Sequence, residues 1–442
     1  RRNPLEANDP SGVKTRRIAR LIGDYNFLRL FGQVGFAQGA ELFGALGEAG
    51  WLTSLKAMPQ LNDIHAKLRS GNYDIKDPLL KELQAYGVPV GLDKYMNSPT
   101  ARLEGDDVFL MDDTATALNN IEIKSGKAKR LVADISFLNP MTMLSQVWSS
   151  KALTMKIVDR IMDLSKTYKT NQIYKNLSEG DQVRFRQLGW TNNEFNNIAK
   201  NIKKHALIED GEFKGLNLDN WDIEARASYV TGISRWIDRV VQRTDLASMN
   251  KWFTNDFVKL IIQFRTFSLG AYEKQLLNGA YTLDQTRGKD FETYNRFISS
   301  MVGAATFASA QTYINSFGMR DREEYLRERL SPTNVAKIAF LRSSWSTLIP
   351  AGIGTINAFF SEEDFFGYGR NTELSSRLVA GIPSVNLGEN IIRSTRMLTK
   401  VMTDPNYKPS ESELKQSLSI LALHNALVVK NINNMVVDKF AK

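Results

Sequence analysis

The sequence predicts a mainly α-helical protein, an extended multi-helix assembly with at most a small β-hairpin near residues 207–216. Apolar residues recur at three- and four-residue steps over much of the chain, which is the period of an amphipathic helix. A strand-like signal is confined to one place, where Asp210-Gly211 separates two short apolar runs and favours a hairpin turn. Two long segments, 297–319 and 343–361, contain no charged side chain, although the rest of the chain is basic and polar.

Composition limits the kinds of site that this chain can form. Its 442 residues are 43% hydrophobic, which is enough for a sizeable core in one extended assembly or in roughly two to four domains. The chain has no cysteine, which excludes disulfides and thiolate metal sites, and its three histidines have no ligand-type spacing. We therefore expect no metal and no cofactor.

The charge balance bears on the partners of the chain. A formal charge of +9 favours acidic partners such as nucleic acid or anionic lipid, although a solvated basic surface explains it equally well. The chain opens on Arg1 and Arg2 and carries no signal-peptide pattern. We expect it to be a fragment or a processed product of a longer protein.

The patterns divide the chain into four regions. Residues 1–125 form a helical region with a glycine-rich helix, and residues 126–250 a helical region with the small hairpin and a basic helix. Residues 251–402 hold an aromatic helix and the two uncharged segments, and residues 403–442 a linker followed by an amphipathic helix.

The glycine-rich helix of the first region covers residues 27–51. So many glycines weaken a helix and predict close packing against a neighbour. Gly35 and Gly39 have the spacing that lets helices approach in lipid, but Glu41 and Glu48 argue against a membrane here. These two carboxylates lie about 10 Å apart along the helix, a spacing that we do not interpret as a glycosidase pair.

Basic side chains cluster twice in the second region. A compact basic run precedes two helical patterns at 141–148 and 152–164, and it consists of Lys124, Lys127, Lys129 and Arg130. A strong helix at 225–245 has one apolar face. Along the same helix, Arg235, Arg239 and Arg243 recur every four residues and therefore share one face. Both clusters predict non-specific contact with nucleic-acid phosphates. For the first the alternative is a solvated surface, and for the second local pairing with Asp238 and Asp245, which the sequence leaves open.

The third region begins with the aromatic helix 251–280, which we interpret as the organising element of the chain. Its apolar face recurs at three- and four-residue steps, and Gly279 is the predicted stop. That face consists of Phe253, Phe257, Leu260, Ile261, Phe264 and Phe267.

The uncharged segments that follow are the candidate membrane or assembly elements. As a helix, segment 297–319 would span about 34 Å, against about 30 Å of bilayer hydrocarbon. Neither segment is apolar enough to insert alone, because Ser, Asn and Gln cost free energy in hydrocarbon. Burial in a core, packing in a larger assembly and joint insertion of several copies all remain open. The candidate residues are Phe297, Gly303, Phe307, Trp345, Gly352, Gly354, Phe359 and Phe360.

In the last region, Ser410 and Glu413 fit a helix capping box. Beyond them, apolar residues alternate steps of four and three like a coiled-coil seam, with Asn425 as one polar position. The seam consists of Leu414, Leu418, Leu421, Asn425, Val428, Ile432 and Met435.

The sequence carries no phosphate-binding loop, dinucleotide fingerprint, H-E-x-x-H or G-x-S-x-G motif, so it predicts a protein that is not an enzyme. The run 263–275, QFRTFSLGAYEKQ, resembles the C-terminal part of the large internal virion proteins, also called core or ejection proteins, of short-tailed phages (podoviruses). The resemblance covers roughly the last two hundred residues. The motif residues in this chain are Phe264, Arg265, Phe267, Gly270 and Tyr272.

The resemblance implies a function and a set of partners. Proteins of this family are packed inside the capsid above the portal, leave through the tail before the genome and rebuild as a channel across the host envelope. A murein-cleaving transglycosylase domain often opens the largest member, and this chain shows none. The implied partners are further copies of the chain, other internal virion proteins and the portal, double-stranded DNA bound non-specifically, and the host inner membrane.

We therefore expect a structural protein that oligomerises and forms part of a channel for viral DNA. It would lie in the virion interior and, after ejection, in the host envelope. A cysteine-free chain has no crosslinks that oppose unfolding during passage through a narrow tail. One alternative is a capsid-core scaffold at the portal that never enters a membrane. Another is an enzyme whose site is assembled from scattered polar residues.

Overall fold

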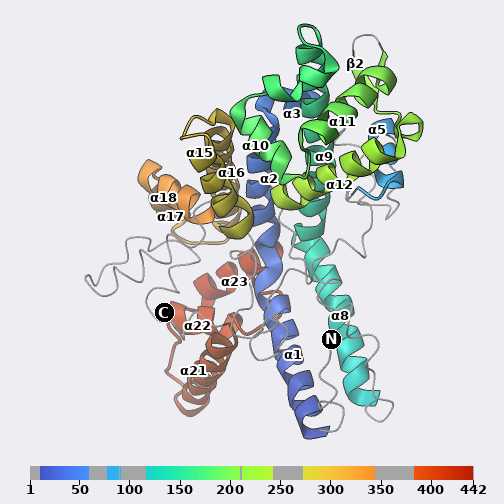
Figure 1. The fold of residues 1–442 in the computed structure, drawn as a ribbon. Helices are drawn as coiled ribbons and strands as arrows, with labels where there is room; N and C mark the ends of the chain where they lie inside the picture. The colour runs from blue at the N-terminus through green and yellow to red at the C-terminus, as the bar shows by residue number, and fades with distance from the viewer. Residues whose placement is uncertain are drawn as a thin grey trace.

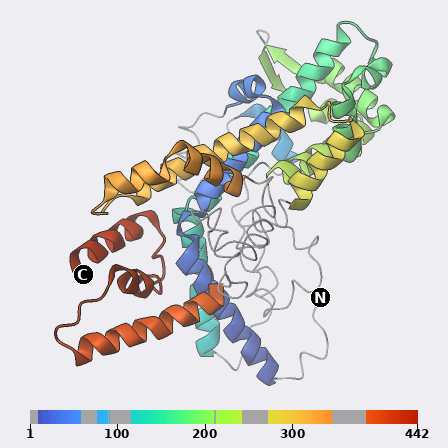
Figure 2. The same ribbon diagram turned by 90° about the vertical axis from the view of Figure 1, so that its left-hand side faces the viewer.

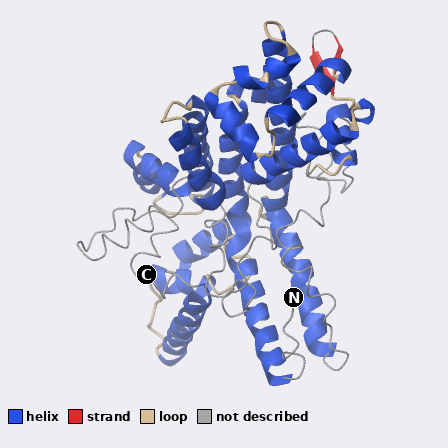
Figure 3. Cartoon of the chain, in the orientation of Figure 1, coloured by secondary structure: helices blue, strands red, loops and turns tan. Residues whose placement is uncertain are grey.

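The structure is a computed structural model that describes residues 10–58, 77–88, 90, 116–209, 212–241, 272–343 and 383–441. The predicted mainly α-helical class is confirmed, and so is the small hairpin. Strands β1 (Leu207–Glu209) and β2 (Glu212–Gly215) pair antiparallel, with Ile208 opposite Phe213 (Figure 3). The turn residues Asp210 and Gly211 lie outside the described residues.

The main hydrophobic core lies in an upper body of short and long helices, with the hairpin at its edge (Figure 1). Its elements are α5 (Pro78–Ala85), α9 (Leu138–Ser165), α10 (Glu179–Gln187), α11 (Asn192–His205) and α12 (Ile223–Val240), with the 3-10 turns η4 (Thr170–Gln172), η5 (Tyr174–Asn176) and η6 (Leu218–Asn220). Local signals start these helices: Asp222 caps α12 by accepting from Ala225 N at 2.8 Å, and Thr191 and Glu194 form a capping box on α11.

Aromatic side chains fill the centre of this core. Trp190 stacks on Tyr229 with ring centroids 5.9 Å apart, and its indole N–H donates to Ser228 O at 2.8 Å. Gly232 of α12 leaves the room, because a Cβ there would overlap the Trp190 indole. The predicted apolar face of α12 is buried as expected, and it consists of Tyr229, Ile233, Trp236, Ile237, Val240 and Val241.

Two helices far apart in sequence form the central pair of the molecule. The glycine-rich helix α2 (Val34–Ala49) runs antiparallel to α16 (Phe291–Asn315), which places Gly47 beside Ser299 and Gly39 beside Phe307 (Figure 2). Close packing of the glycine-rich helix is therefore observed. In return, Gly303 of α16 admits Phe43, since a Cβ at Gly303 would lie 2.6 Å from Phe43 Cβ.

Shorter elements extend this pair. The turn η2 (Phe31–Gln33) precedes α2, α3 (Trp51–Lys56) follows it, and the π-helical turn Tyr272–Leu277 leads into α15 (Asn278–Gln285) before α16. Helices α17 (Arg322–Arg329) and α18 (Pro332–Arg342) come after α16, and α18 packs back on it. Helix α18 begins with Pro332 in its first turn, after Ser331.

The remaining helices form a lower part, in which α1 (Pro10–Leu30) and α8 (Thr116–Ile135) extend side by side (Figure 1). Helix α21 (Pro383–Thr403) contacts α1. Helix α22 (Glu411–Leu418) packs against α21, and α23 (Leu427–Phe440) packs against α22. The Ser410 and Glu413 capping box of α22 is confirmed.

Three sequence expectations are wrong in detail. Gly279 lies in the first turn of α15 and does not end a helix. The two patterns at 141–148 and 152–164 belong to the single helix α9. The coiled-coil seam is interrupted after Leu418, where α22 ends, and α23 begins only at Leu427. Between the two helices, Leu423 adopts a left-handed conformation with φ 64°. There, Leu423 N and Asn425 Nδ2 donate to Leu28 O and Leu30 O, carbonyls left open at the end of α1.

The first prediction follows from the tight contact between Gly232 and the Trp190 indole. Gly232→Ala would force the Trp190 indole aside, and we expect a loss of about 1–3 kcal/mol in the free energy of unfolding. The matched control is Gly388→Ala in the second turn of α21, where a Cβ meets nothing within 4 Å. That variant should be more stable by about 0.5–1 kcal/mol. Denaturant unfolding measures both, and equal effects would contradict the close approach.

Candidate functional site

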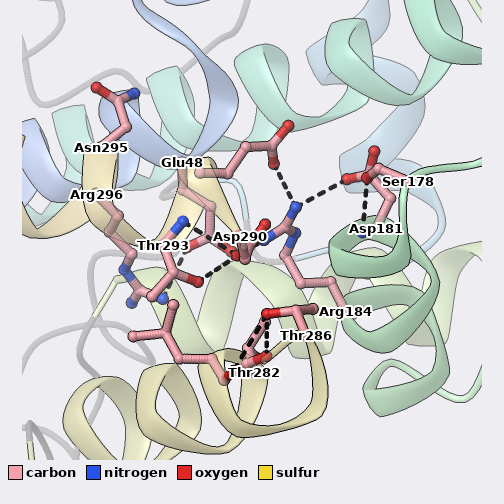
Figure 4. A network of polar contacts seen from close by, with 12 residues as sticks. Glu48, Ser178, Asp181, Arg184, Thr282, Thr286, Asp290, Thr293, Asn295 and Arg296 are labelled. Carbon is pink, nitrogen blue, oxygen red and sulfur yellow. Dashed lines mark hydrogen bonds and ion pairs between the residues drawn. The ribbon is translucent and has the colours of Figure 1, made fainter. Parts of the chain in front are cut away.

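A buried network of charges joins five helices at the C-terminal end of α2, and it is the candidate site (Figure 4). At its centre is the carboxylate of Glu48, which is 3% exposed. Its Oε1 accepts from Trp236 Nε1 at 2.6 Å and from Arg239 Nη2 at 2.9 Å, both on α12. Its Oε2 pairs with Arg296 Nη1 of α16 at 2.8 Å.

These partners decide the ionisation of Glu48. Burial by itself raises the pKa of the carboxyl, because a low-dielectric interior disfavours the charge. The attraction of Arg296 and Arg239, with the Trp236 hydrogen bond, outweighs burial and lowers the pKa of Glu48 from 4.5 to about 2. Glu48 is therefore a fixed negative charge that holds two arginines inside the protein.

A second buried cation organises the other half of the network. The guanidinium of Arg184 on α10 contacts three carboxylates: Asp290 Oδ2 at 2.6 Å, Glu292 Oε2 at 2.7 Å and Asp181 Oδ1 at 3.1 Å. Burial alone lowers the pKa of Arg184, but these carboxylates raise it above its ordinary value. Asp290 also caps α16 by accepting from Thr293 N at 3.1 Å, so the start of α16 is tied to α10.

Helix α9 completes the connection. Lys156 Nζ donates to Glu48 O at 2.7 Å and pairs with Glu292, and Arg160 contacts Glu292 at 3.1 Å and Asp181 at 3.5 Å. The network thus ties α2, α9, α10, α12 and α16 together. Its carboxylates are ion-paired, so its evident role is to fix the helices.

Glu41, seven residues before Glu48 on α2, has the opposite environment. Its carboxyl is buried, and within the described part of the chain neither oxygen has a hydrogen-bond partner. Burial raises the pKa of Glu41 well above 4.5, against the weaker opposing attraction of Arg296 and Lys274. The pair of carboxylates noted in the sequence therefore consists of one ion-paired charge and one group that burial favours in its neutral form.

The predicted arginine stripe on α12 does not form a surface. Arg239 is buried against Glu48 and Gln187, so it cannot meet a phosphate. Arg235 is exposed and donates to Leu188 O at 3.1 Å, and Arg243 lies outside the described residues. The buried face of α12 is wide enough to include position 239, which the four-residue spacing alone does not reveal.

The basic run on α8 is also divided. Lys124 and Lys127 are exposed, whereas Lys129 is buried and pairs with Asp24 of α1 at 2.8 Å. Lys129 therefore holds two helices together and is not available to DNA. The side chain of Arg130 lies outside the described residues.

The membrane and assembly candidates on α16 take part in packing within the chain. Phe297 is half-buried, Gly303 admits Phe43, and the Phe307 ring packs against Phe36 and Phe43 at 6.5 and 6.0 Å between centroids. Across the described ranges, no helix combines the length and the hydropathy needed to cross a bilayer. The other candidates, Trp345, Gly352, Gly354, Phe359 and Phe360, lie outside those ranges.

The motif that carries the family resemblance is mostly outside the described residues. This applies to Phe264, Arg265, Phe267 and Gly270, while Tyr272 opens the π-helical turn. In that turn Lys274 Nζ donates to Asp238 O at 3.2 Å, which links it to α12.

Sequence reasoning missed the charge network. Arg184, Lys156 and Glu292 have no motif spacing, and they meet only because α9, α10 and α16 converge. Asp290 carried a readable signal, since an Asp before an apolar helix is a common N-cap. Within the described residues, no group of three or more His, Asp or Glu could hold a metal ion.

Comparisons with protein-family models, with characterised proteins and with solved structures find no significant match to this chain.

The network makes a prediction about Glu48. Glu48→Gln leaves Arg239 and Arg296 without their buried counter-charge, and we expect a loss of about 3–5 kcal/mol in the free energy of unfolding at pH 7. Because the folded pKa of Glu48 is depressed, its contribution is present above pH 4.5 and is lost as the pH falls towards 2. The stability difference between wild type and variant should therefore shrink over that range.

Glu41→Gln is the matched control on the same helix. The raised pKa of Glu41 means that folding works against its ionisation at pH 7, so the variant should equal or exceed wild type there and match it at pH 4. Urea unfolding from pH 2 to 7 measures both variants. A larger loss at position 41 than at position 48 would refute the assignment of the two roles.

Proposed function

We propose that this chain is a structural, non-enzymatic protein of a phage virion interior that assembles with its own copies around the path of the DNA. The observation that carries the proposal is an exposed apolar stripe along α16 and the turn that follows it. A second copy is the occupant that the stripe fits best, because family resemblance and surface chemistry point the same way.

Helix α16 is apolar on its outer side and polar or small on its inner side. The outer stripe follows steps of three and four residues with one interruption, and large side chains on it are 41–77% exposed. The stripe consists of Phe291, Tyr294, Ile298, Val302 and Tyr313 on α16 and Phe317 in the turn after it. The Arg322 guanidinium lies over the Tyr313 and Phe317 rings at the far end of the stripe. The inner side carries Arg296, Ser300, Gly303 and Gln311, which are buried. A helix of a monomer normally has the reverse arrangement.

The size of the stripe supports assembly. Six large apolar side chains exposed to this degree amount to an area on the order of 600 Å², against about 800 Å² per partner in a standard interface. The middle of the stripe, with Ile298 and Val302, lies in segment 297–319, which carries no charge, so this part suits an equally apolar partner surface.

Helices α21 and α23 expose apolar residues on another part of the chain. On α21 these include Ile391, Leu398 and Met402, and on α23 Val428, Ile432 and Met435. Two different apolar surfaces on one chain support a head-to-tail contact, which closes into a ring when the rotation between copies permits.

The packing of α16 bears on membrane insertion. Entry of this helix into a bilayer requires that it leave α2, which would separate Arg296 from Glu48 and Phe307 from its notch at Gly39. This observation supports a packed state for the particle interior. It also favours the second candidate function, a capsid-core scaffold that does not insert. The channel and the scaffold differ in whether α16 is released from α2 after ejection.

Assembly through the α16 stripe is tested by Ile298→Asp combined with Val302→Asp. Two charges in the apolar surface should shift sedimenting oligomers to monomers. The control is Ala227→Asp with Thr231→Asp, which places two charges four residues apart on the exposed face of α12. Loss of oligomers in both variants, or in neither, would count against the stripe.

Release of α16 is tested with a disulfide. An ideal Cβ at Gly44 lies 3.4 Å from Ser300 Cβ, close to disulfide geometry, and the chain has no other cysteine. In a Gly44→Cys, Ser300→Cys variant, we expect oxidation to abolish permeabilisation of anionic vesicles and reduction to restore it. Equal leakage in both states excludes insertion by a released α16, and the scaffold role then stands.

A further inference from the structure

Exposed lysines gather where α11 packs against the turns η4 and η5, at the end of the upper body (Figure 1). The group consists of Lys169, Lys175, Lys200, Lys203 and Lys204. We call it the α11 lysine surface. None of the five forms an ion pair with any residue in the described part of the chain, in contrast to Lys129, Lys156 and Arg239.

Contacts between the turns and the helix bring these lysines onto one surface. Lys203 Nζ lies 3.5 Å from Thr170 Oγ1, next to Lys169. Asn196 of α11 donates to Asn171 O at 3.3 Å and accepts from Tyr174 N at 3.3 Å, next to Lys175. Lys200, Lys203 and Lys204 fall within about one helical turn, or 5–6 Å of axis.

The carboxylates around this surface are largely engaged elsewhere. Asp163 pairs with Lys166 at 2.8 Å, and Glu194 caps the start of α11. Asp222, which attracts Lys200, accepts hydrogen bonds from Ala225 N and Asn201 Nδ2. The surface therefore keeps a positive field that is open to a polyanion.

We propose that the α11 lysine surface binds the phosphodiester backbone of double-stranded DNA without reading its sequence. This inference rests on the proposed function and names the face of the chain that contacts the DNA. It replaces the arginine stripe on α12, whose member Arg239 is buried.

The chemistry of the surface favours DNA over an anionic membrane. Exposed amides beside the lysines, on Asn171, Gln172 and Asn193, can donate hydrogen bonds to phosphate and sugar oxygens. A membrane-binding amphipathic helix needs a free apolar face. On α11 that face is occupied, because Phe195, Ile198 and Ile202 are fully buried in the core.

Salt dependence gives the inference a quantitative form. Each phosphate neutralised by a lysine contributes about −0.9 to the slope of log K against log salt concentration. Five contacts predict a slope of about −4.5 for the full chain, and removing three lysines should reduce its magnitude by about 2.7.

The test uses the full chain and a 30-base-pair duplex of arbitrary sequence, titrated by fluorescence anisotropy between 50 and 200 mM salt. The variant is Lys169→Gln, Lys200→Gln, Lys203→Gln. The control removes the same charge elsewhere, at three exposed lysines on α8 and in the segment before α22: Lys124→Gln, Lys127→Gln, Lys408→Gln. We expect a flatter slope and weaker binding for the first triple, and little change for the second.

The outcomes separate this inference from the proposed function. A salt slope equal to that of wild type in the first triple variant overturns the inference. A larger loss of DNA affinity in the control variant also overturns it, because the DNA would then contact α8. If the first triple variant loses binding to phosphatidylserine vesicles while its DNA binding is intact, the surface binds lipid and the inference is overturned. If the wild-type chain binds no DNA, both the inference and the DNA role of the proposed function fail. If the Ala227→Asp, Thr231→Asp control loses its oligomers, only the proposed assembly through α16 is affected.

Discussion

The ion pairs of Glu48 with Arg239 and Arg296 are the interaction on which the rest of the structure depends. They join α2, α12 and α16 at one point, and Arg184 and Lys156 extend the connection to α10 and α9. Buried charges are stable only when each has its counter-charge, so the members of the network hold one another in place. The upper body and the α2–α16 pair therefore depend on the same group of contacts.

The close approach of α2 and α16 is the second constraint. Glycines on both helices admit aromatic rings from the other, which explains the glycine content of a helix that would otherwise be weak. Because mostly small and polar residues of α16 face α2, several of its large apolar residues, such as Ile298 and Val302, face outward. The same segment thus stabilises the fold on one side and exposes an apolar stripe on the other.

The distribution of positive charge follows from this packing. Lys129 and Arg239 pair with carboxylates between helices, so they support the fold. The lysines of α11 and its neighbouring turns lie on the outside, since the apolar face of α11 fills the core. In a basic protein, part of the positive charge can therefore form internal ion pairs, while the rest is exposed on one surface where a polyanion could bind.

The sequence by itself determined the α-helical class, the hairpin at 207–216, the apolar face of α12 and the cap at Ser410, because these depend on residues close together in the chain. Only the tertiary structure decided that Arg239 and Lys129 are buried, that Glu41 and Glu48 differ in ionisation, and that the seam after Leu418 breaks at Leu423 to meet the end of α1. The physical reason is that ionisation, burial and capping by distant donors depend on neighbours hundreds of residues away, such as Arg296 beside Glu48. Local periodicity carries no information about which distant group will be there.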